Sequence, residues 1–549
     1  MFGTSMFATT MFNKFKEEYF FTGEDCRLAL NLFCCIYGIG TLGMPGNFAR
    51  AGPTIAVITM AFMAFANIYS SVVLSKVMLL APNSVKTFGD LGQWSMGATG
   101  RWLCIITQMV SCLLIPCDFL VLGGHLLDGL FVDAFNQTTW IVFMALMVLP
   151  VCLVPTLKEG SGAAFAGCLG TIVADFIGVA VVMHGMRGHP SVPFPGLRFS
   201  QVVGAFGNLA LAYGAGIVIP DLQRQHSDPA RMPRVVGVTV AFSSILFLVV
   251  SSMAYSALGC QISGNLLFTI YPDSDTGLTS LGFEPDWGYV VLAYLFMQLH
   301  VTIAFSVILN PAFYICERLF LGMHKSVPEY IGSEFDYEEN GPSGDVLFAN
   351  AASSDRQSQL QSNCQSNCRS KTSHLSVIDS RRLYKEIEDV EAAEYSANLI
   401  NFIALRMVII AILVGLAIIF KDHFTEFADI VGASCITISC ILLPIIFYLI
   451  KAWDRIPLYE SVAAITVVVV CFILGCYVTF TTGKALFSEV HEDGEFPFCE
   501  GEYKHQIYYY YHHYPDVGTH VGSHVGTHLG THLGTHVGMN DDSSLNSSD

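Results

Sequence analysis

The chain has 549 residues, of which 53% are hydrophobic and 13% charged, with a mean hydropathy of +0.52 and a formal net charge of −18. Soluble proteins carry about 25% charged residues, so this composition excludes an ordinary soluble protein and predicts a protein of the lipid bilayer. We expect neither a cofactor nor a nucleic-acid partner.

Apolar stretches long enough to cross a membrane recur along the whole chain. A helix needs about 20 predominantly apolar residues to cross the hydrocarbon core, and eleven stretches meet that need, with ends uncertain by several residues. These spans are 27–48, 53–75, 102–127, 138–157, 160–183, 201–220, 235–258, 287–316, 404–420, 427–450 and 459–482. The sequence therefore predicts an all-α polytopic membrane protein with eleven transmembrane helices.

The spans divide the chain into five parts. Residues 1–26 form a polar N-terminal tail without the features of a signal peptide, and 27–316 hold spans one to eight. The polar, Ser-rich loop 317–403 has too little apolar surface to offset its chain entropy, so we expect it to be largely disordered. Spans nine to eleven occupy 404–482, and a His-rich tail follows at 483–549.

Basic residues predict the orientation of the chain. With a cytosolic N-terminus, the short inner segments hold twelve Lys and Arg residues and the outer loops four, as the positive-inside rule requires. The loop 317–403 then lies in the cytosol, and the tail 483–549 lies outside the cell or in an organelle lumen. Both NxS/T sequons, at Asn136 and Asn546, fall on the outer side.

The first span contains the stretch YGIGTLGMP, Tyr37 to Pro45, with glycines spaced as GxGxxG. A dinucleotide site with this spacing needs a preceding strand and an acidic residue about 20 positions on. Here the glycines lie inside an apolar span, and the positions near 60 contain no acid. The context disfavours a nucleotide site and leaves an interruption of the helix to be explained.

A second interruption lies in the sixth span, where Tyr213-Gly214-Ala215-Gly216 is followed by Pro220. Spans one and six each begin a block of five, and both carry a glycine cluster followed by a proline. Close helix packing through small residues is one explanation. Paired interruptions in two halves are, however, typical of inverted-repeat transporters that bind substrate at the midplane. The pattern favours a 5+5 inverted repeat plus one extra helix.

Broken helices provide the chemistry that an amino acid needs. The freed N–H groups at the start of a half-helix, aided by its dipole, suit a carboxylate. The freed carbonyls suit an ammonium group or a cation, and glycine lets the main chain approach the ligand closely.

The two interrupted segments resemble the amino acid/auxin permease family. The first is NLFCCIYGIGTLGMPGNFARAG (31–52) and the second is GAGIVIPDLQRQHSDP (214–229); Asn310-Pro311 in span eight fits the same pattern. The resemblance covers roughly 25–482. It implies the fold of the bacterial leucine transporter, with an amino acid substrate held by the main chain of the residues Gly38, Ile39, Gly40, Thr41, Tyr213, Gly214, Ala215 and Gly216.

Two departures from the family bear on the coupling ion. Sodium-coupled relatives have Asn where this chain has Cys34, which weakens a sodium interpretation. Many animal proton-coupled relatives have Glu where this chain has Tyr213, so a proton acceptor must lie elsewhere.

Acidic residues within the spans are the candidates for ion coupling. Asp118 and Asp175 lie in spans three and five, and an acid in the membrane is costly and usually marks an ion path. A neutral, hydrogen-bonded structural acid is the alternative. Thr302 and Ser306 in span eight can offer hydroxyl oxygens to a cation, although such residues commonly bond their own helix. We interpret His300 as a core histidine with its hydrogen bonds satisfied.

The tail 483–549 repeats the tetrapeptide G(S/T)H(V/L). It places a histidine at every fourth position, and such tracts bind zinc or copper through neutral imidazole; unselected low complexity is the alternative. The histidines in question are His520, His524, His528, His532 and His536.

Cys260 and Cys499 are the two cysteines that plainly lie outside, and a disulfide between them is one option. Neither HExxH nor a nucleophile elbow occurs, so we do not expect an enzyme. The sequence predicts a secondary active transporter of neutral amino acids that works by alternating access with proton coupling, in the plasma membrane or a vacuolar or lysosomal membrane. The alternatives are a non-transporting amino acid receptor, a passive channel and sodium-coupled transport.

Overall fold

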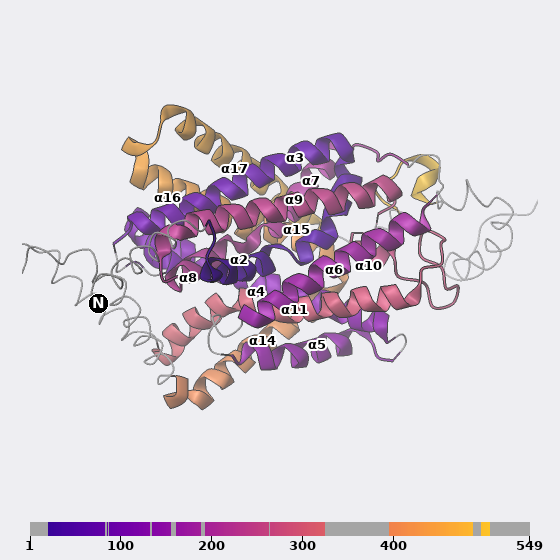
Figure 1. Cartoon of the computed structure of the whole chain (residues 1–549), viewed down its shortest axis with the longest axis horizontal. Coiled ribbons are helices and arrows are strands. Elements are labelled where there is room, and N and C mark those ends of the chain that lie inside the picture. Colours follow the sequence, from indigo (N-terminus) through magenta and orange to yellow (C-terminus); the bar gives the residue numbers. More distant parts are fainter. Residues whose placement is uncertain are drawn as a thin grey trace, which may run out of the picture.

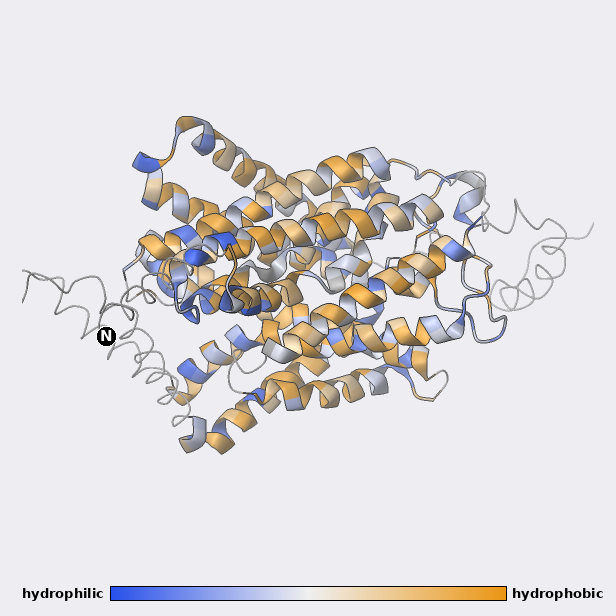
Figure 2. Ribbon diagram, viewed as in Figure 1, coloured by the Kyte–Doolittle hydropathy of each residue, from blue (hydrophilic) through white to orange (hydrophobic). Residues whose placement is uncertain are grey.

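The computed structural model describes residues 20–82, 85, 87–131, 134–154, 161–187, 193–262, 264–323, 395–486 and 496–505. Long helices run roughly side by side through this part of the chain, with apolar residues along their length and polar residues gathered at the two ends of the bundle (Figures 1 and 2). Strand pairing in these ranges is confined to two isolated bridges, Pro195 with Cys499 and Pro272 with Thr279.

The helices follow the order of the expected spans. They are α2 (Gly23–Ile36), α3 (Ile39–Leu80), α4 (Phe88–Leu130), α5 (Gln137–Cys152), α6 (Ser161–Gly185), α7 (Phe199–Ala212), η1 (Gly214–Val218), α8 (Ile219–Arg224), α9 (Met232–Leu258), α10 (Leu266–Thr269), α11 (Trp287–Cys316), η3 (Glu317–Leu321), α14 (Leu399–Phe420), α15 (Phe424–Val431), η5 (Gly432–Leu442), α16 (Leu443–Ala452) and α17 (Leu458–Leu486). The prediction of an all-α multi-pass membrane protein is confirmed.

Nine helical stretches of the described chain are long and apolar enough to cross a membrane, and α5 is a shorter apolar helix of 16 residues. One of the nine, α3, is 42 residues long and consists of two helices joined across a kink at Gly52, whose φ is 71°. Glycine tolerates this left-handed conformation, which a side chain would strain. The number of crossings, eleven, stays a prediction.

Capping boxes start two helices earlier than hydropathy indicated. Thr22 accepts a hydrogen bond from the Asp25 amide (3.2 Å) while Asp25 accepts one from the Thr22 amide (2.7 Å), so α2 begins at Gly23 instead of 27. The same pair of bonds between Thr87 and Asp90 starts α4 at Phe88, well before 102. Hydropathy misses such turns because their residues are polar.

The helices at the centre of the bundle are those that contain the interrupted segments. α3 packs along α7 and α9, α2 packs against α6 and α9, and α11 packs along α6 and α4. α14 and α17 are the least buried of the long helices and lie at opposite edges of the bundle in Figure 1. The arrangement surrounds the interruptions with other helices instead of lipid.

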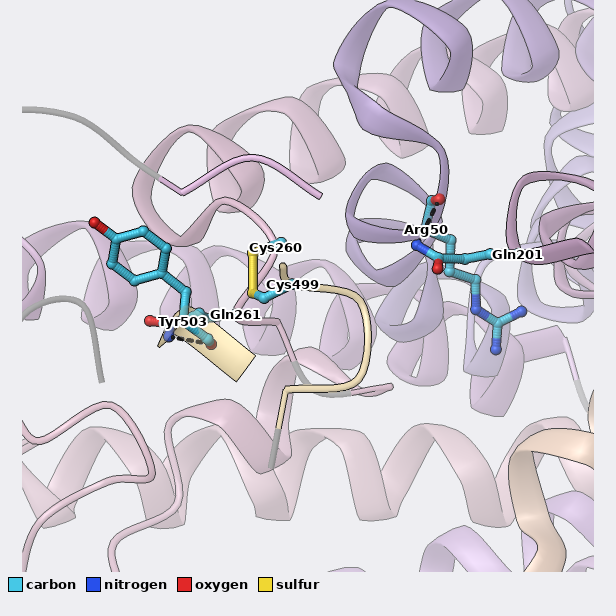
Figure 3. Close-up of a disulfide and its surroundings, with 6 residues drawn as sticks. All are labelled: Arg50, Gln201, Cys260, Gln261, Cys499 and Tyr503. Carbon is cyan, nitrogen blue, oxygen red and sulfur yellow. Dashed lines mark hydrogen bonds between the residues drawn. A yellow bond between two sulfur atoms is a disulfide. The ribbon is translucent and has the colours of Figure 1, made fainter. Parts of the chain in front are cut away.

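A disulfide joins Cys260, after α9, to Cys499, beyond α17, so the pairing considered from the sequence is present (Figure 3). Further contacts hold the same segment: the Gly196 amide donates to the Phe498 carbonyl (3.0 Å), and the Gln261 side chain donates to the Tyr503 carbonyl (3.0 Å). The segment 496–505 lies at the end of the bundle opposite the start of α2 (Figure 1).

A buried ion pair joins α5, η3 and α14. The Arg406 side chain, 1% exposed, donates from Nε to Glu317 Oε1 (2.8 Å) and from Nη1 to the carbonyl of Cys152 (2.6 Å). The Tyr395 hydroxyl donates to the other Glu317 oxygen (2.9 Å). Because the charges are paired and further hydrogen-bonded, the pair is tolerated in the core, whereas one partner alone would be strongly destabilising.

We therefore expect Arg406→Met to lower the free energy of unfolding by about 3–5 kcal/mol, because it leaves the Glu317 carboxylate buried and unpaired. Thermal unfolding of the purified protein in detergent measures the change. The double variant Glu317→Gln/Arg406→Met should unfold at a higher temperature than Arg406→Met alone, and Arg455→Met, at an exposed position, serves as the control. Equal loss in the single and double variants would contradict the coupling.

Candidate functional site

The first interruption separates α2 from α3. α2 ends at Ile36, Tyr37 has non-helical angles (φ −96°, ψ 88°), and α3 starts after Gly38, which gives it no side-chain cap. The Thr41 amide bonds the Gly38 carbonyl (3.1 Å). The first amides of a helix have no intrahelical acceptor, so α3 begins with N–H groups that are free for another partner.

The second interruption separates α7 from α8. α7 ends at Ala212, the 3₁₀ turn η1 covers Gly214–Val218, and α8 begins at Ile219 with Pro220 in its first turn. A proline there costs no hydrogen bond, because the first amides of a helix are unpaired in any case. The interruptions expected from the two glycine clusters are both present.

The two breaks touch one another. A Cβ on Gly40 would lie 2.4 Å from the Cβ and 2.6 Å from the Cα of Ala212, so only glycine permits this approach of α3 to the end of α7. A Cβ on Gly216 would lie 2.9 Å from Cys440 in η5, and one on Gly432 would lie 2.0 Å from the Gly207 carbonyl oxygen. Glycines thus bring the first, sixth and tenth spans together by their main chains.

A third departure from α-helix lies in the tenth span and was missed by the sequence reasoning. η5 is a π-helix of 11 residues between α15 and α16, and π-helical turns are frequent at functional sites. It begins with the small residues Gly432 and Ala433. A run of small residues indicates no particular helix type, so the sequence held no clear signal for it.

Several buried polar atoms within the bundle have no hydrogen-bond partner among the described residues. Such atoms are rare in proteins and call for an explanation, such as a ligand, an ion or ordered water. They include Asn31 Oδ1, Thr41 Oγ1, Ser111 Oγ, both carboxyl oxygens of Asp118 and of Asp175, and Nε2 of His300.

The two candidate carboxyl groups have different surroundings. Asp175 on α6 is fully buried and lies near Tyr37, the residue at the first break, but neither of its carboxyl oxygens has a hydrogen-bond partner among the described residues. Asp118 on α4 is also fully buried, and its charged neighbour is Asp429 of α15. Asp175 therefore belongs to the first break, and Asp118 is associated with the tenth span.

The remaining predicted site residues are less engaged with the breaks. Thr302 and Ser306 donate to carbonyls of their own helix, those of Gln298 (2.8 Å) and Ile303 (2.8 Å). The Tyr213 hydroxyl points to α9, where it donates to Ser244 (2.9 Å), so this residue meets the site with its main chain. The proposed metal site falls outside the described residues; its members are His520, His524, His528, His532 and His536.

His300 is only half satisfied, which corrects the interpretation as an ordinary core histidine. Its Nδ1 lies 3.2 Å from the Gly167 carbonyl oxygen, and its Nε2 has no partner among the described residues. A Cβ on Gly38 would lie 2.1 Å from that Nε2. The ring of span eight thus abuts the first break, a placement that follows only from the packing of α11 against α6 and α2.

A pocket opens beside the breaks, on the side of the bundle where the disulfide lies. Arg50 at its edge pairs with Asp429 (2.8 Å) and lies 5.4 Å from the ring centroid of Phe498, and Asn47 donates to Asn208 (3.0 Å). Its lining residues are Gly43, Gly46, Asn47, Arg50, Leu122, Asn208, Leu211, Gly264, Asn265, Thr425, Ala428 and Phe498.

At the other end of the bundle, a charged cluster holds the start of α2 against the segment between α8 and α9. Asp25 accepts hydrogen bonds from Arg231 Nη2 (2.7 Å) and Nε (3.0 Å) and from His226 Nε2 (2.8 Å). The Asp228 amide donates to His226 Nδ1 (2.9 Å), so the ring hydrogen is on Nε2. Glu24 adds an acceptor for the Ser227 amide (2.9 Å).

Burial alone would raise the pKa of Asp25, but hydrogen bonds from Arg231, the Thr22 amide and His226 outweigh it and hold the pKa well below its usual value. A lowered pKa in the folded state means that this carboxylate stabilises the fold above the unfolded value. The contribution is lost only as the pH falls through the lowered pKa. The cluster therefore persists where an ordinary aspartate would already be protonated.

These features define a multi-pass membrane protein whose interrupted helices meet at a polar centre. The family model "Transmembrane amino acid transporter protein" matches residues 24–488, and the chain belongs to that family, which consists of transporters and not enzymes. The resemblance inferred from the two motifs is thereby confirmed.

Individual relatives are distant. Amino acid transporter AVT1D of Arabidopsis thaliana is 22% identical over 241 residues, 42% of this chain and 42% of the relative. Vacuolar amino acid transporter 7 of Saccharomyces cerevisiae is 24% identical over 279 residues, 46% of this chain and 53% of the relative. The chain matches about half the length of these relatives.

Among solved structures, Mhp1, a nucleobase-cation-symport-1 family transporter, is similar with 13% identity and a TM-score of 0.45. The similarity covers 86% of this chain and 95% of that one.

The contact between the breaks predicts a sharp difference between two glycines. Gly40→Ala forces the new Cβ into the main chain of Ala212. We therefore expect uptake of labelled amino acids to fall by about 5-fold to 150-fold, which corresponds to overpacking costs of about 1–3 kcal/mol. Gly204→Ala, in α7, meets open space and should leave uptake unchanged while stabilising the helix by up to about 1 kcal/mol. Normal uptake by Gly40→Ala would show that the close approach is dispensable.

Proposed function

We propose that this protein is a secondary active transporter of neutral amino acids that works by alternating access and is driven by protons. The observation that carries the proposal is the contact of the two helix breaks at Gly40 and Ala212, within a chain of the amino acid transporter family. The relative in yeast is named a vacuolar transporter. A vacuolar or lysosomal membrane, or the plasma membrane, is the proposed location.

The proposed topology has eleven crossings. In it, α2 with the first part of α3 makes the first crossing, the rest of α3 makes the second, α7, η1 and α8 make the sixth, and α15, η5 and α16 make the tenth. Spans one to five and six to ten then form two blocks, each opening with a broken helix, and α17 is the extra helix. The N-terminus is cytosolic in this scheme, and the disulfide lies on the outer or lumenal side.

The substrate is proposed to bind in the breaks through its shared zwitterion. The amides at the start of α3, from Gly38 to Gly40, suit the carboxylate, and the dipole of α3 adds to the attraction. Thr41 lies beside them with its hydroxyl unpartnered among the described residues. Carbonyls at the end of α2 and the main chain of Tyr213–Gly216 suit the ammonium group. Because main-chain groups make these contacts, recognition of the substrate's side chain falls to the surrounding helices.

Two polar contacts at opposite ends of the bundle are suited to open in turn, as alternating access requires. Arg50 and Asp429 join α3 to α15 beside the pocket, and Asp25 with Arg231 joins α2 to the segment before α9. Each joins a part of the first span to an element of the second half. Opening one while the other stays closed would expose the breaks to one side only.

Proton coupling is favoured by the unpartnered carboxyl groups. Asp175 is the first candidate because it lies near Tyr37 at the break, and Asp118 is the second. Sodium coupling is the alternative, in which Thr302 and Ser306 offer oxygen atoms to the ion. Both hydroxyls keep lone pairs for that role while they donate to their own helix.

Reconstitution into liposomes tests the proposed activity. Vesicles are loaded with or without an unlabelled amino acid mixture, and uptake of labelled neutral amino acids is followed under an imposed pH gradient, a sodium gradient or neither. Saturable uptake that accumulates under the pH gradient is expected. Saturable binding without accumulation would indicate a receptor, flux without saturation or counterflow a channel, and accumulation only with sodium the alternative ion.

Asp175→Asn should abolish the dependence of uptake on the pH gradient, because the amide has the size of the carboxyl group but carries no exchangeable charge. Counterflow exchange at equal pH should remain within about threefold of wild type. Asp275→Asn, an exposed position in the loop before α11, is the control and should retain the full pH dependence. Unchanged pH dependence in Asp175→Asn would remove this residue from the coupling mechanism.

A further inference from the structure

His300 has one nitrogen anchored and one nitrogen free. A carbonyl oxygen only accepts hydrogen bonds, so Nδ1, 3.2 Å from the Gly167 carbonyl, carries the ring hydrogen. Nε2 of the neutral ring is then an acceptor with a lone pair, and it has no partner among the described residues although the side chain is fully buried. The lone pair lies against Gly38, in the first break.

The space around Nε2 distinguishes a proton from a larger ligand. The Cβ position of Gly38 is 2.1 Å from Nε2, so the main chain of the break lies directly against the nitrogen and leaves no room for an amino acid between them. A hydrogen on Nε2 would point at the main chain of Gly38, so protonation requires that this main chain move away from the ring. The ring itself need not turn, since Nδ1 keeps its hydrogen bond to Gly167 whether Nε2 is protonated or not.

The titratable groups on the helices around His300 lie partly beside the break and partly at the helix ends. Beside the break, α2 carries Cys34 and Cys35 and is followed by Tyr37, and α6 carries Cys168 and Asp175, which lies near Tyr37. At the helix ends, α2 carries Glu24, Asp25, Cys26 and Arg27, and α6 carries His184. Within the described residues, α5, η1 and α10 contribute no acidic or basic side chain. η3, which follows α11, contributes Arg318 and Glu317, and Glu317 is paired with Arg406 of α14.

α4 also packs against α11. Its long apolar part carries Asp118, associated with Asp429, His125, which contacts Gln137, and the thiols of Cys104, Cys112 and Cys117. Asp90 and Arg101 lie toward its start and Asp128 near its end. Asp175 is therefore the carboxyl group associated with the same break as the ring, through the residue next to Gly38.

We propose that Nε2 of His300 binds the proton that drives transport, at the break of the first span, and that it works together with Asp175. This proposal rests on the proposed function. The neutral ring takes a proton from water on one side, which gives an imidazolium ion with a hydrogen on each nitrogen. After the bundle has reopened on the other side, Nε2 releases that proton to water and the ring is neutral again.

Two substitutions separate this role from a structural one. In His300→Asn the side-chain amide retains a donor near the Nδ1 position for the Gly167 carbonyl and removes Nε2. In His300→Gln the amide reaches toward the Nε2 position but does not titrate. His125→Gln, a half-buried histidine of α4 that contacts Gln137, is the matched control.

Both His300 variants are expected to keep counterflow exchange at equal pH within about threefold of wild type. Their accumulation under the pH gradient should fall to the level seen without a gradient, and uptake should no longer vary with pH between 5 and 8. The His125→Gln control should accumulate like wild type. These measurements use the full-length protein in liposomes, with size-exclusion chromatography to check folding.

Accumulation that persists in either His300 variant would overturn the proposal. Loss of exchange together with accumulation, or loss of folded protein in both variants, would overturn it as well, because the ring would then be structural. If the wild-type protein exchanges amino acids but does not respond to the pH gradient, the proposed proton role of His300 is refuted, whereas amino acid transport is not. Absence of exchange in wild type would instead refute the proposed function itself.

Discussion

The absence of water from the bilayer core is the constraint on which the structure depends, because every main-chain N–H and carbonyl there must find a partner inside the protein or in a ligand. Two helices of this chain nevertheless break in mid-span, at Tyr37-Gly38 and at Gly214–Val218. The breaks are compatible with the membrane because they face one another inside the bundle, shielded from lipid. What makes them face one another is the contact of Gly40 with Ala212, closer than any larger residue allows.

Close main-chain contact requires glycine, and this requirement made the two breaks predictable from the sequence. Glycine clusters inside apolar spans, with proline following, have few other causes, so the positions of both breaks follow from composition and spacing. The helices follow from hydropathy, except where polar caps such as Thr22 and Thr87 extend them. The pairing of Cys260 with Cys499 could be considered from the sequence because the proposed topology leaves few cysteines on the outer or lumenal side.

Contacts between residues far apart in the sequence could not be predicted, for a physical reason. Asp25 meets Arg231 across 206 positions, and Arg50 meets Asp429 across 379. Each of these residues, taken alone, looks like a solvated charge near a span end, and no local pattern pairs them. The free nitrogen of His300 is a similar case, since whether a buried histidine is satisfied depends on which main-chain groups the neighbouring helices present.

Buried polar groups in this bundle fall into two kinds, which differ in whether their hydrogen bonds are satisfied. Glu317 and Arg406 are buried with partners for both charges, as a structural ion pair in low dielectric requires. The carboxyl oxygens of Asp118 and Asp175 and the Nε2 atom of His300 are equally buried and have no hydrogen-bond partner among the described residues. An unpaired acid or base in such a place is costly, and a group that must gain and lose a proton during each cycle is one that permanent hydrogen bonds would hinder, because they would fix it in a single protonation state.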